Sequence, residues 1–449
     1  MKRSREGISW EDHLDYDHKG NRLSTTENLR LILLNDPFLK GRFGQNCFDG
    51  RRWLRQAPPW NAQRPWYGPR LWDDGDDAGL RWHLESYWGV TGRSAVADAL
   101  ELAAREQTFH PVKDYLENLY WDGVERLDTM LIDYLQAEDT PFVRAVSRKW
   151  MVAGCKRIFE PGCKFDTMLV LISPGQGRGK SLLGDILAGE WFKDGLRDIT
   201  GKDALQELQG KWIVELGELS GLKKAENETV KQFLSCRKDT YRPSYGRYAL
   251  DFPRQCIFLG STNDREFITD ETGGRRFWPV EIHGSAETTT ERMEGLRIVR
   301  DLLWAEAMER YRQGEKTWLS TAEEIAAGES EQQRFAQQDE WVGLVRAYLE
   351  RTLPRDWEKM PPEARRAFIC SGEKGEIPRR RVSIAEIRYE LLGEEMKGAN
   401  ASSRRLGKIM NVMEDWKAVG VRETVFGKQK VYDRRWTGFA ANNGQTQQL

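Results

Sequence analysis

A glycine-rich stretch at residues 173–181 has the residue types that bind nucleotide phosphates. It reads SPGQGRGKS, a near match to G-x-x-x-x-G-K-[ST], because Pro174 stands where the first glycine is expected and the glycine follows one place later. In that pattern the backbone N–H groups surround the phosphates, while the lysine supplies a cation and the serine an oxygen for Mg²⁺. The predicted nucleotide-binding residues are Gly175, Gln176, Gly177, Arg178, Gly179, Lys180, Ser181 and Leu182. The alternative is a glycine-rich turn that merely precedes a lysine.

Pro174 removes one backbone N–H, but it lies at the entry of the loop. The amides expected to lie nearest the phosphates belong to residues 177–181, which are intact. A predicted strand precedes the loop and a predicted helix follows it, which is the context that a phosphate-binding loop requires. We therefore expect the proline to affect nucleotide affinity more than the existence of the site.

Two acidic residues follow a second apolar segment, WIVELGEL at residues 212–219. Glu215 ends the predicted strand and Glu218 comes three residues later. A nucleotide hydrolase needs a carboxylate at the end of a neighbouring strand to hold Mg²⁺ and to polarise the attacking water. Ser181 and Glu215 are the predicted metal ligands, and which glutamate acts on the water stays open. The alternative is a pair of solvated acids at a strand end.

A third predicted strand, CIFLGSTN at residues 256–263, ends in Asn263. An amide at this point can orient the attacking water and sense the γ-phosphate. Downstream, two glycines precede Arg275 and Arg276 on a predicted exposed turn. Either arginine is a candidate arginine finger that reaches the nucleotide of a neighbouring subunit. The alternative is a surface or phosphate-binding arginine pair.

Basic and aromatic residues alternate in the turn-rich segment 231–255, KQFLSCRKDTYRPSYGRYALDFPRQ. Cations suit the backbone of single-stranded DNA, and exposed rings can stack on its bases. The predicted DNA contacts of this segment are Lys231, Lys238, Arg242, Tyr245 and Arg247. The alternative is a solvated loop that its aromatic residues anchor.

The elements that must position these residues predict an α/β fold. Strands that alternate with helices across residues 165–310 indicate a mostly parallel sheet covered by helices. Residues 25–162 have helical apolar spacing and are expected to be all-helical, with a long proline- and tryptophan-rich connection at residues 55–77. The predicted divisions are a tail at 1–24, a helical region at 25–162, a nucleotide-binding core at 163–330, a connection at 331–377, a C-terminal module at 378–437 and a tail at 438–449.

The C-terminal module has the pattern of a winged helix. Ser383 and Glu386 form a predicted capping box, a second helix opens at Ser402 or Ser403, and two strands surround a glycine-containing turn at residues 421–436. The basic residues expected to face DNA phosphates are Arg379, Arg380, Arg381, Arg404, Arg405 and Lys408. The alternative is a small packing domain without a ligand.

Composition excludes several classes of protein. The 449 residues carry a net charge of −1, so any nucleic-acid surface is local, and a hydrophobic share of 39% allows a core. No apolar run approaches the roughly 18 residues of a membrane helix, and the N-terminus lacks the apolar stretch of a signal peptide. The six cysteines form no C-x-x-C pair and indicate reduced thiols of a cytoplasmic protein. The five histidines have no metal-ligand spacing.

The order of these motifs resembles the virulence-associated protein E family, ATPases of phages and genomic islands that are related to superfamily 3 helicases and to poxvirus-type primase-helicases. The segments that carry the resemblance are LVLISPGQGRGKS, WIVELGELSGL, KQFLSCRKDTYRPSYGR, FLGSTN and TDETGGRRFWPV, with HPVKDYLENLYWDG and EPGCKFD upstream. The resemblance covers residues 25–332. The family pattern usually has glycine where Pro174 stands.

The resemblance implies an AAA+-like core that assembles as a ring, with a homo-hexamer as the expected state. ATP with Mg²⁺ would be hydrolysed between subunits while channel loops draw single-stranded DNA. Carried over by position, Lys180 and Ser181 match Walker A, Glu215 and Glu218 match Walker B, Asn263 matches the sensor, and Arg275 or Arg276 matches the finger.

The implied function is a DNA helicase that replicates a phage or mobile element in the bacterial cytoplasm. The rival interpretations are a DNA-stimulated regulatory or loader ATPase without unwinding, and a DNA-binding scaffold without turnover. Many relatives carry a primase domain, but no acidic pair in a strand setting precedes Thr25. We therefore expect the primase to be absent or supplied by another chain.

Overall fold

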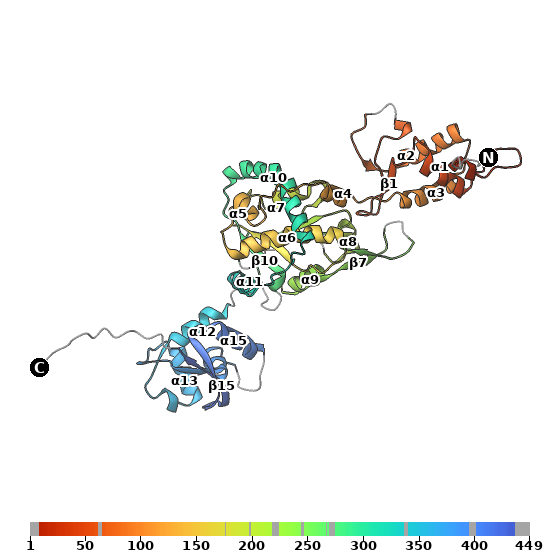
Figure 1. Cartoon of the computed structure of the whole chain (residues 1–449). Helices are drawn as coiled ribbons and strands as arrows, with labels where there is room; N and C mark the ends of the chain where they lie inside the picture. The colour runs from red at the N-terminus through yellow and green to blue at the C-terminus, as the bar shows by residue number, and fades with distance from the viewer. Residues whose placement is uncertain are drawn as a thin grey trace, which may run out of the picture. The chain divides into compact units, whose positions relative to one another are not determined.

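The computed structural model describes residues 9–435 apart from 62–64, 176, 197–198, 218–223, 244–246, 266, 269–273, 336–339 and 395–400, and also omits the side chains of 224–227 and 286. The chain forms two compact units, Met1–Ala336 and Gln337–Leu449 (Figure 1). The division between them falls inside the connection predicted at 331–377. None of the helices described is long and apolar enough to cross a membrane.

The N-terminal part of the first unit mixes helices with a small sheet. Its main elements are α1 (Thr26–Asn35), α2 (Asp74–His83), η3 (Leu84–Trp88), α3 (Arg93–Glu106) and the antiparallel strands β1 (Phe43–Gln45), β2 (Arg52–Leu54) and β3 (Arg70–Leu71). The prediction of an all-helical region was wrong here. Strands of two or three residues are too short to show the alternation that marks a strand in sequence.

Tryptophans hold the connection at residues 55–77 in place. The indole of Trp60 donates to Asp76 at 3.0 Å, and that of Trp72 donates to Asp77 at 2.8 Å. The two rings meet edge to face with centroids 5.9 Å apart. Because both acceptors lie in the first turn of α2, the connection is fixed to the start of that helix.

A five-stranded parallel sheet forms the centre of the first unit, in the order β10-β4-β9-β6-β5. The strands are β4 (Met168–Ile172), β5 (Phe192–Lys193), β6 (Ile213–Leu216), β9 (Ile257–Thr262) and β10 (Phe277–Glu281). Ile172 lies beside both Thr262 and Glu281, so the carboxyl ends of β4, β9 and β10 share one edge. The predicted α/β fold with a mainly parallel sheet is confirmed.

Helices cover both faces of this sheet, and β4 is buried on both. The side chains of Leu169 and Leu171 belong to the core cluster beneath α6 (Pro141–Phe159) and α10 (Ala286–Arg312). Those of Val170 and Ile172 point to the opposite cluster, which α8 (Lys202–Glu207) and α9 (Lys224–Ser235) help to close. The remaining helices of this unit are α4 (Pro111–Glu117), α5 (Met130–Leu135), α7 (Lys180–Ala188) and α11 (Ala322–Arg334).

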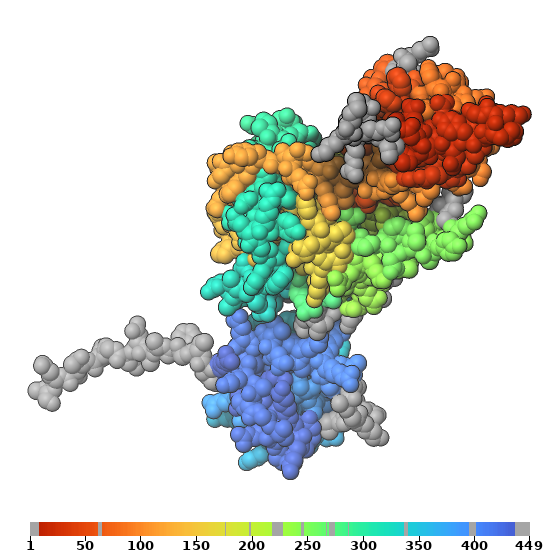
Figure 2. Space-filling view, turned by 45° about the vertical axis from the view of Figure 1, so that its right-hand side comes forward, coloured from red at the N-terminus to blue at the C-terminus, as the bar shows by residue number. Residues whose placement is uncertain are grey.

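A two-stranded hairpin, β7 (Lys238–Tyr241) with β8 (Leu250–Pro253), replaces the turn-rich loop expected before β9. The hairpin extends from the core (Figures 1 and 2). Its base is held by Arg254, which donates two hydrogen bonds to Asp239 at 2.8 and 2.7 Å with both side chains buried. A buried bidentate pair is rigid, so the base of the hairpin is a fixed part of the core.

The C-terminal unit is built around a second antiparallel sheet in the order β13-β15-β14. Its elements are α12 (Trp341–Glu350), β11 (Thr352–Leu353), η6 (Trp357–Lys359), α13 (Pro362–Ser371), β12 (Ile377–Pro378), β13 (Arg381–Ser383), α14 (Ile384–Glu386), η7 (Ile387–Leu391), α15 (Ala401–Val412), β14 (Trp416–Thr424) and β15 (Gly427–Arg434). The predicted capping box of Ser383 and Glu386 is present, as are the two predicted C-terminal strands.

Candidate nucleotide-binding site

The glycine-rich loop connects the carboxyl end of β4 to the start of α7. Gly177 and Gly179 have φ of 72° and 86°, in the left-handed region that glycine adopts without strain. The first N–H groups of α7 have no partner within the helix, so they remain available to an anion. Gln176 lies outside the described residues. The strand–loop–helix context expected for residues 173–181 is therefore present.

Lys180 reaches across the sheet edge from the first turn of α7. Its Nζ donates to Asn263 Oδ1 at 2.5 Å and to the backbone carbonyls of Thr262 and Ser173 at 3.1 and 3.4 Å. Two residues 83 positions apart meet because β4 and β9 are neighbours in the sheet. Burial lowers the pKa of Lys180.

Ser181 lies against the predicted metal-binding acid. Its hydroxyl donates to Glu215 Oε1 at 2.9 Å, and the glutamate is only 2% exposed. Burial raises the pKa of Glu215, while the hydrogen bond from Ser181 lowers it. Among the described residues, Glu215 Oε2 is buried without a hydrogen-bond partner.

These two side chains fit a hard divalent cation. The serine hydroxyl and the buried carboxylate oxygen that accepts no hydrogen bond are oxygen ligands of the kind that Mg²⁺ prefers. The described part of the chain holds no cluster of three or more His, Cys, Asp and Glu side chains placed for a metal. Phosphate oxygens and water would therefore complete the coordination of the ion, as is usual for nucleotide-bound Mg²⁺.

Asp194 is a neighbour of Glu215 that the sequence analysis missed. It directly follows β5, at the same edge of the sheet, and its proximity raises the pKa of Glu215. The backbone N–H of Leu196 donates to the carbonyl of Glu215 at 2.8 Å, which fixes this segment against β6. The only sequence signal was an acid after a two-residue strand, which is too short to recognise. Glu218, the second predicted acid, lies outside the described residues.

Arg178 lies along the loop rather than pointing away from it. Its guanidinium donates to the carbonyl of Gly284 at 2.9 Å, at the junction between β10 and α10. A Cβ at Gly175 would stand 2.8 Å from Arg178 Nε, so the absence of a side chain at Gly175 leaves room for the arginine. Leu182 is half-buried and packs against the core below α7.

The two candidate finger residues lie at the amino ends of the strands, opposite to the carboxyl ends that carry the loop. They belong to η5 (Gly274–Arg276), which precedes β10, and Phe277 at the start of β10 is paired with Met168 at the start of β4. The loop follows the other end of β4, about 16 Å away for a five-residue strand. Arg276 Nε donates to Ser235 Oγ at 2.9 Å, whereas Arg275 is exposed. Both arginines therefore lie far from the loop of their own chain.

The hairpin presents most of the predicted DNA-binding residues of its segment. Lys238, Arg242 and Arg247 are exposed, and so is Tyr248, at 76%. Lys238 also forms an ion pair with Asp251 on the facing strand. Tyr245 lies outside the described residues.

Lys231 does not join this surface, and its prediction as a DNA contact is corrected. It is buried on α9, and its Nζ lies 3.0 Å from Glu228 Oε1. The helical spacing of α9 turns this residue toward the protein, which the alternation of basic and aromatic residues in the sequence did not reveal.

Basic residues of the C-terminal unit divide into exposed and internal ones. Arg404 and Lys408 are exposed on α15, and Arg380 is exposed before β13. Arg405 is half-buried, with its guanidinium 4.0 Å from the ring centre of Trp341. The phosphate contacts of these four residues stay predictions.

One of the predicted phosphate contacts is corrected. Arg379 is fully buried, 4.1 Å from the ring centre of Tyr348 and 3.6 Å from Glu390, so it is part of the core. Arg381 is exposed and donates to both carboxylate oxygens of Asp433, at 2.7 and 2.9 Å, and its phosphate contact stays a prediction. The run of three arginines concealed the burial of Arg379, because its packing against Tyr348 joins residues that are distant in the sequence.

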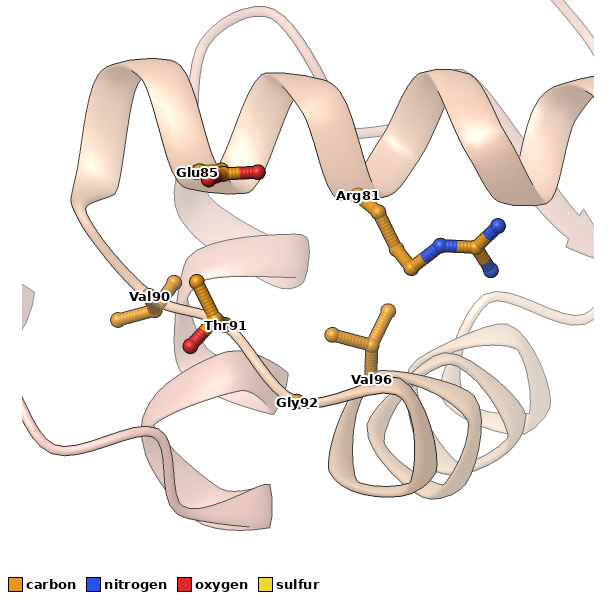
Figure 3. Close-up of a pocket in the computed structure, with 6 residues that line it drawn as sticks. All are labelled: Arg81, Glu85, Val90, Thr91, Gly92 and Val96. Atoms are coloured by element: carbon orange, nitrogen blue, oxygen red, sulfur yellow. The ribbon is translucent and has the colours of Figure 1, made fainter.

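The structure also has a small pocket between the end of α2, η3 and the start of α3 (Figure 3). Arg81 and Glu85 border it, with Val90, Thr91, Gly92 and Val96. No residue predicted to bind nucleotide or DNA lines this pocket. The chemistry suggested by the sequence is at the edge of the parallel sheet instead.

Fold and site together define a mixed α/β protein whose parallel sheet carries polar and acidic side chains at its carboxyl edge. Residues 116–337 match the model of the virulence-associated protein E-like domain. This part of the chain therefore belongs to that family, and it contains the loop, Glu215, Asn263 and both candidate finger arginines.

Solved structures with a similar backbone include apo structures of the C-terminal region of NrS-1. The A-form structure has 12% identity and a TM-score of 0.47, with 92% of this chain and 100% of that chain covered. A second apo structure has 12% identity and a TM-score of 0.48, with 87% and 95% covered. No curated protein sequence matches the chain.

Proposed function

We propose that the protein is an ATP-dependent motor that acts on single-stranded DNA as a ring and unwinds duplex DNA during replication of a phage or mobile element. The observation that carries the proposal is the convergence of Lys180, Ser181, Glu215 and Asn263 on the carboxyl edge of one parallel sheet. Ligands of open parallel sheets bind at this edge. The order of the five strands and the match to the virulence-associated protein E-like domain support an AAA+-like core of the P-loop class.

Each residue then has one task in hydrolysis. The N–H groups of the loop and Lys180 bind the β- and γ-phosphates, which requires the lysine to exchange its present carbonyl partners for phosphate oxygens. Ser181 and Glu215 hold Mg²⁺, which neutralises phosphate charge when bound. Asn263 orients the attacking water. Glu218 is the second candidate, beside Glu215, for the acid that polarises this water.

The position of the arginines supports a ring. Because η5 lies at the amino ends of the strands and the loop at their carboxyl ends, a finger from η5 serves the nucleotide of an adjacent copy. Arg275 is the better candidate, since Arg276 is already bound to Ser235. A homo-hexamer is the proposed assembly, and its number of subunits rests on the family resemblance alone.

DNA contacts are proposed on the two units separately. In the first, the exposed cations of the hairpin bind the single-strand backbone while Tyr248 offers a ring for stacking. In the second, the sheet order β13-β15-β14 with α15 supports a winged helix, in which Arg404 and Lys408 face phosphates. The alternative function is a DNA-stimulated regulatory or loader ATPase that lacks unwinding, with a separate primase as a further partner.

Steady-state ATP hydrolysis with and without single-stranded DNA, beside displacement of a labelled strand, separates these possibilities. DNA-stimulated hydrolysis together with displacement supports the helicase. Hydrolysis without displacement supports the regulatory ATPase. DNA binding without any hydrolysis would refute both and leave a scaffold.

Pro174→Gly is expected to change the affinity for MgATP by less than about tenfold, because it restores one N–H at the exposed entry of the loop. The reaction and its DNA stimulation should persist. Equilibrium binding and hydrolysis measured on the same preparation check this. A complete loss of hydrolysis would show that the phosphate-binding loop begins elsewhere.

The raised pKa of Glu215 predicts a pH dependence of metal-assisted binding. As the pH falls, this carboxyl takes up a proton above the ordinary value of 4.5, and the protonated form no longer suits Mg²⁺. When the pH is lowered from about 8 to 5, the affinity for MgATP should therefore begin to fall at a higher pH than it would with a glutamate of ordinary pKa. Binding of ATP in EDTA serves as the control and should lack this component.

The same shift has a consequence for stability without ligand. A carboxyl whose pKa is raised in the folded state stabilises the fold below its unfolded pKa, and this contribution is lost as the pH rises through the folded pKa. Glu215→Gln should therefore raise the thermal midpoint of the ligand-free protein at about pH 8 while abolishing Mg²⁺-dependent hydrolysis. A lower midpoint with normal hydrolysis would contradict the assigned role.

A further inference from the structure

Gln136 has an unusual backbone conformation close to the candidate site. It ends α5 with φ of 54°, and among the described residues it is the one non-glycine position with a positive φ of this kind. A side chain disfavours this region, so helix ends of this shape usually carry glycine. A residue kept in such a conformation is a reason to look for a task of its side chain.

The backbone of Gln136 is held from several directions. Its N–H donates to Ile132 O at 3.0 Å, and the N–H of Ala137 donates to Leu131 O at 3.2 Å, which is the usual pair of bonds at a helix end. Its carbonyl accepts a hydrogen bond from the N–H of His283 at 3.2 Å. Glycine could make all of these bonds, so they do not explain a glutamine.

The residue lies beside the phosphate-binding loop. A Cβ at Gly179 would stand 3.4 Å from Leu135 and 3.3 Å from Met293, so α5 and the first turns of α10 close around the loop. His283, which binds the Gln136 carbonyl, precedes Gly284, which binds the Arg178 guanidinium. Figure 1 shows α5, α7 and α10 gathered in one part of the core.

The side chain of Gln136 is exposed, and within the described residues its amide has no hydrogen-bond partner. The half-buried ring of Tyr134, two residues before Gln136, supplies apolar surface on α5 and packs against α10, where it lies 3.4 Å from a Cβ built at Gly295. A base that extends from phosphates held at the loop needs an apolar surface and one polar group that reads its edge. A glutamine amide offers a donor and an acceptor side by side, which match N6–H and a ring nitrogen of adenine.

From this juxtaposition we infer that Gln136 reads the base of the bound nucleotide and selects adenine. Its amide oxygen accepts from the exocyclic amine, and its amide N–H donates to a ring nitrogen. On the edge of the base that carries N7, guanine presents the acceptor O6 where adenine presents the amine, so the amide oxygen finds no donor there in either orientation of the amide. The inference rests on the proposed nucleotide-binding function and adds its specificity.

The test compares equilibrium binding of MgATP, MgGTP and magnesium tripolyphosphate to the wild-type chain, Gln136→Gly and Gln136→Glu. Glycine suits the backbone and removes only the amide, while glutamate replaces the donor by an acceptor. Both variants should lose about tenfold in MgATP affinity, and their preference for MgATP over MgGTP should fall towards one. Affinity for tripolyphosphate, which has no base, should stay unchanged. Gln313→Gly, on an exposed glutamine at the far end of α10, is the matched control.

The outcomes distinguish this inference from the function on which it rests. An unchanged ratio of MgATP to MgGTP affinity in Gln136→Gly would overturn the base-reading role and leave the nucleotide site in place. An equal loss for tripolyphosphate would also overturn it, because the residue would then act on the shape of the loop. If the wild-type chain binds none of the three compounds, the proposed function itself fails.

Discussion

Lys180→Ala is expected to reduce ATP hydrolysis by about 10²- to 10³-fold, the range for loss of one group that stabilises transition-state charge. Lys180 occupies the centre of the candidate site, where its Nζ is hydrogen-bonded to Asn263 and to two backbone carbonyls at the sheet edge. Alanine removes the cation that the phosphates would meet at this position. Steady-state hydrolysis at saturating single-stranded DNA measures the loss.

A matched substitution separates this effect from a general loss of lysine charge. Lys202 is exposed at the start of α8 in the same unit, and Lys202→Ala should hydrolyse ATP at the wild-type rate. Because Lys180 also binds main-chain carbonyls, the thermal midpoint of each variant should be recorded beside its activity. A folded Lys180→Ala protein with the wild-type rate would remove the basis of the proposed function.

Arg275→Ala is expected to reduce hydrolysis by about 10³-fold or more, the effect of losing an arginine finger. The residue is exposed at the edge of the sheet opposite to the loop, so its effect on catalysis requires a neighbouring copy. Nucleotide binding should be nearly unchanged, since the finger acts on the charge that develops during transfer. Hydrolysis and equilibrium binding of MgATP together distinguish these two effects.

Mixing two inactive variants tests the neighbouring-copy requirement directly. Lys180→Ala subunits keep their arginine and Arg275→Ala subunits keep their loop, so an interface that combines the two is complete. In an equal random mixture about one quarter of the interfaces are complete, and activity should return in proportion. Mixtures that stay inactive, although the subunits exchange, would exclude a shared site.

Arg276→Ala is the control for the finger assignment. Its guanidinium is bound to Ser235 at the end of α9, so this substitution removes a contact inside the chain. We expect it to lower hydrolysis less than Arg275→Ala does. If neither substitution affects hydrolysis, the finger proposal is wrong, and if Arg276→Ala alone abolishes it, the roles of the two arginines are exchanged.

Local signals in the sequence were strong where an element is long or has a cap. The strand and helix around the glycine-rich loop, the strand that carries Glu215 and the capping box at Ser383 are all where they were predicted. Each depends on neighbours in the chain, such as a buried apolar run or a side chain that caps a helix three residues away. The virulence-associated protein E-like domain was recognisable for the same reason, because its motifs are short and ordered.

Short strands and side-chain direction were not accessible in this way. The strands β1, β2 and β3 were missed, and with them the mixed character of the N-terminal region. Asp194 was overlooked because it follows a strand of two residues. Arg379 and Lys231 were predicted to lie on the surface, yet both are buried. Arg379 packs against Tyr348 and Lys231 pairs with Glu228, and composition does not reveal these contacts.

The sequence by itself determined the residue types at the candidate site and their order along the chain, because a loop, a strand end and a turn are local features. Only the tertiary structure decided which of them meet. Lys180 and Asn263 touch because β9 lies next to β4. Arg275 is remote from the loop because it precedes β10, whereas the loop follows β4, and these two strands are parallel. Strand order arises from packing across the whole sheet, so no local pattern encodes it.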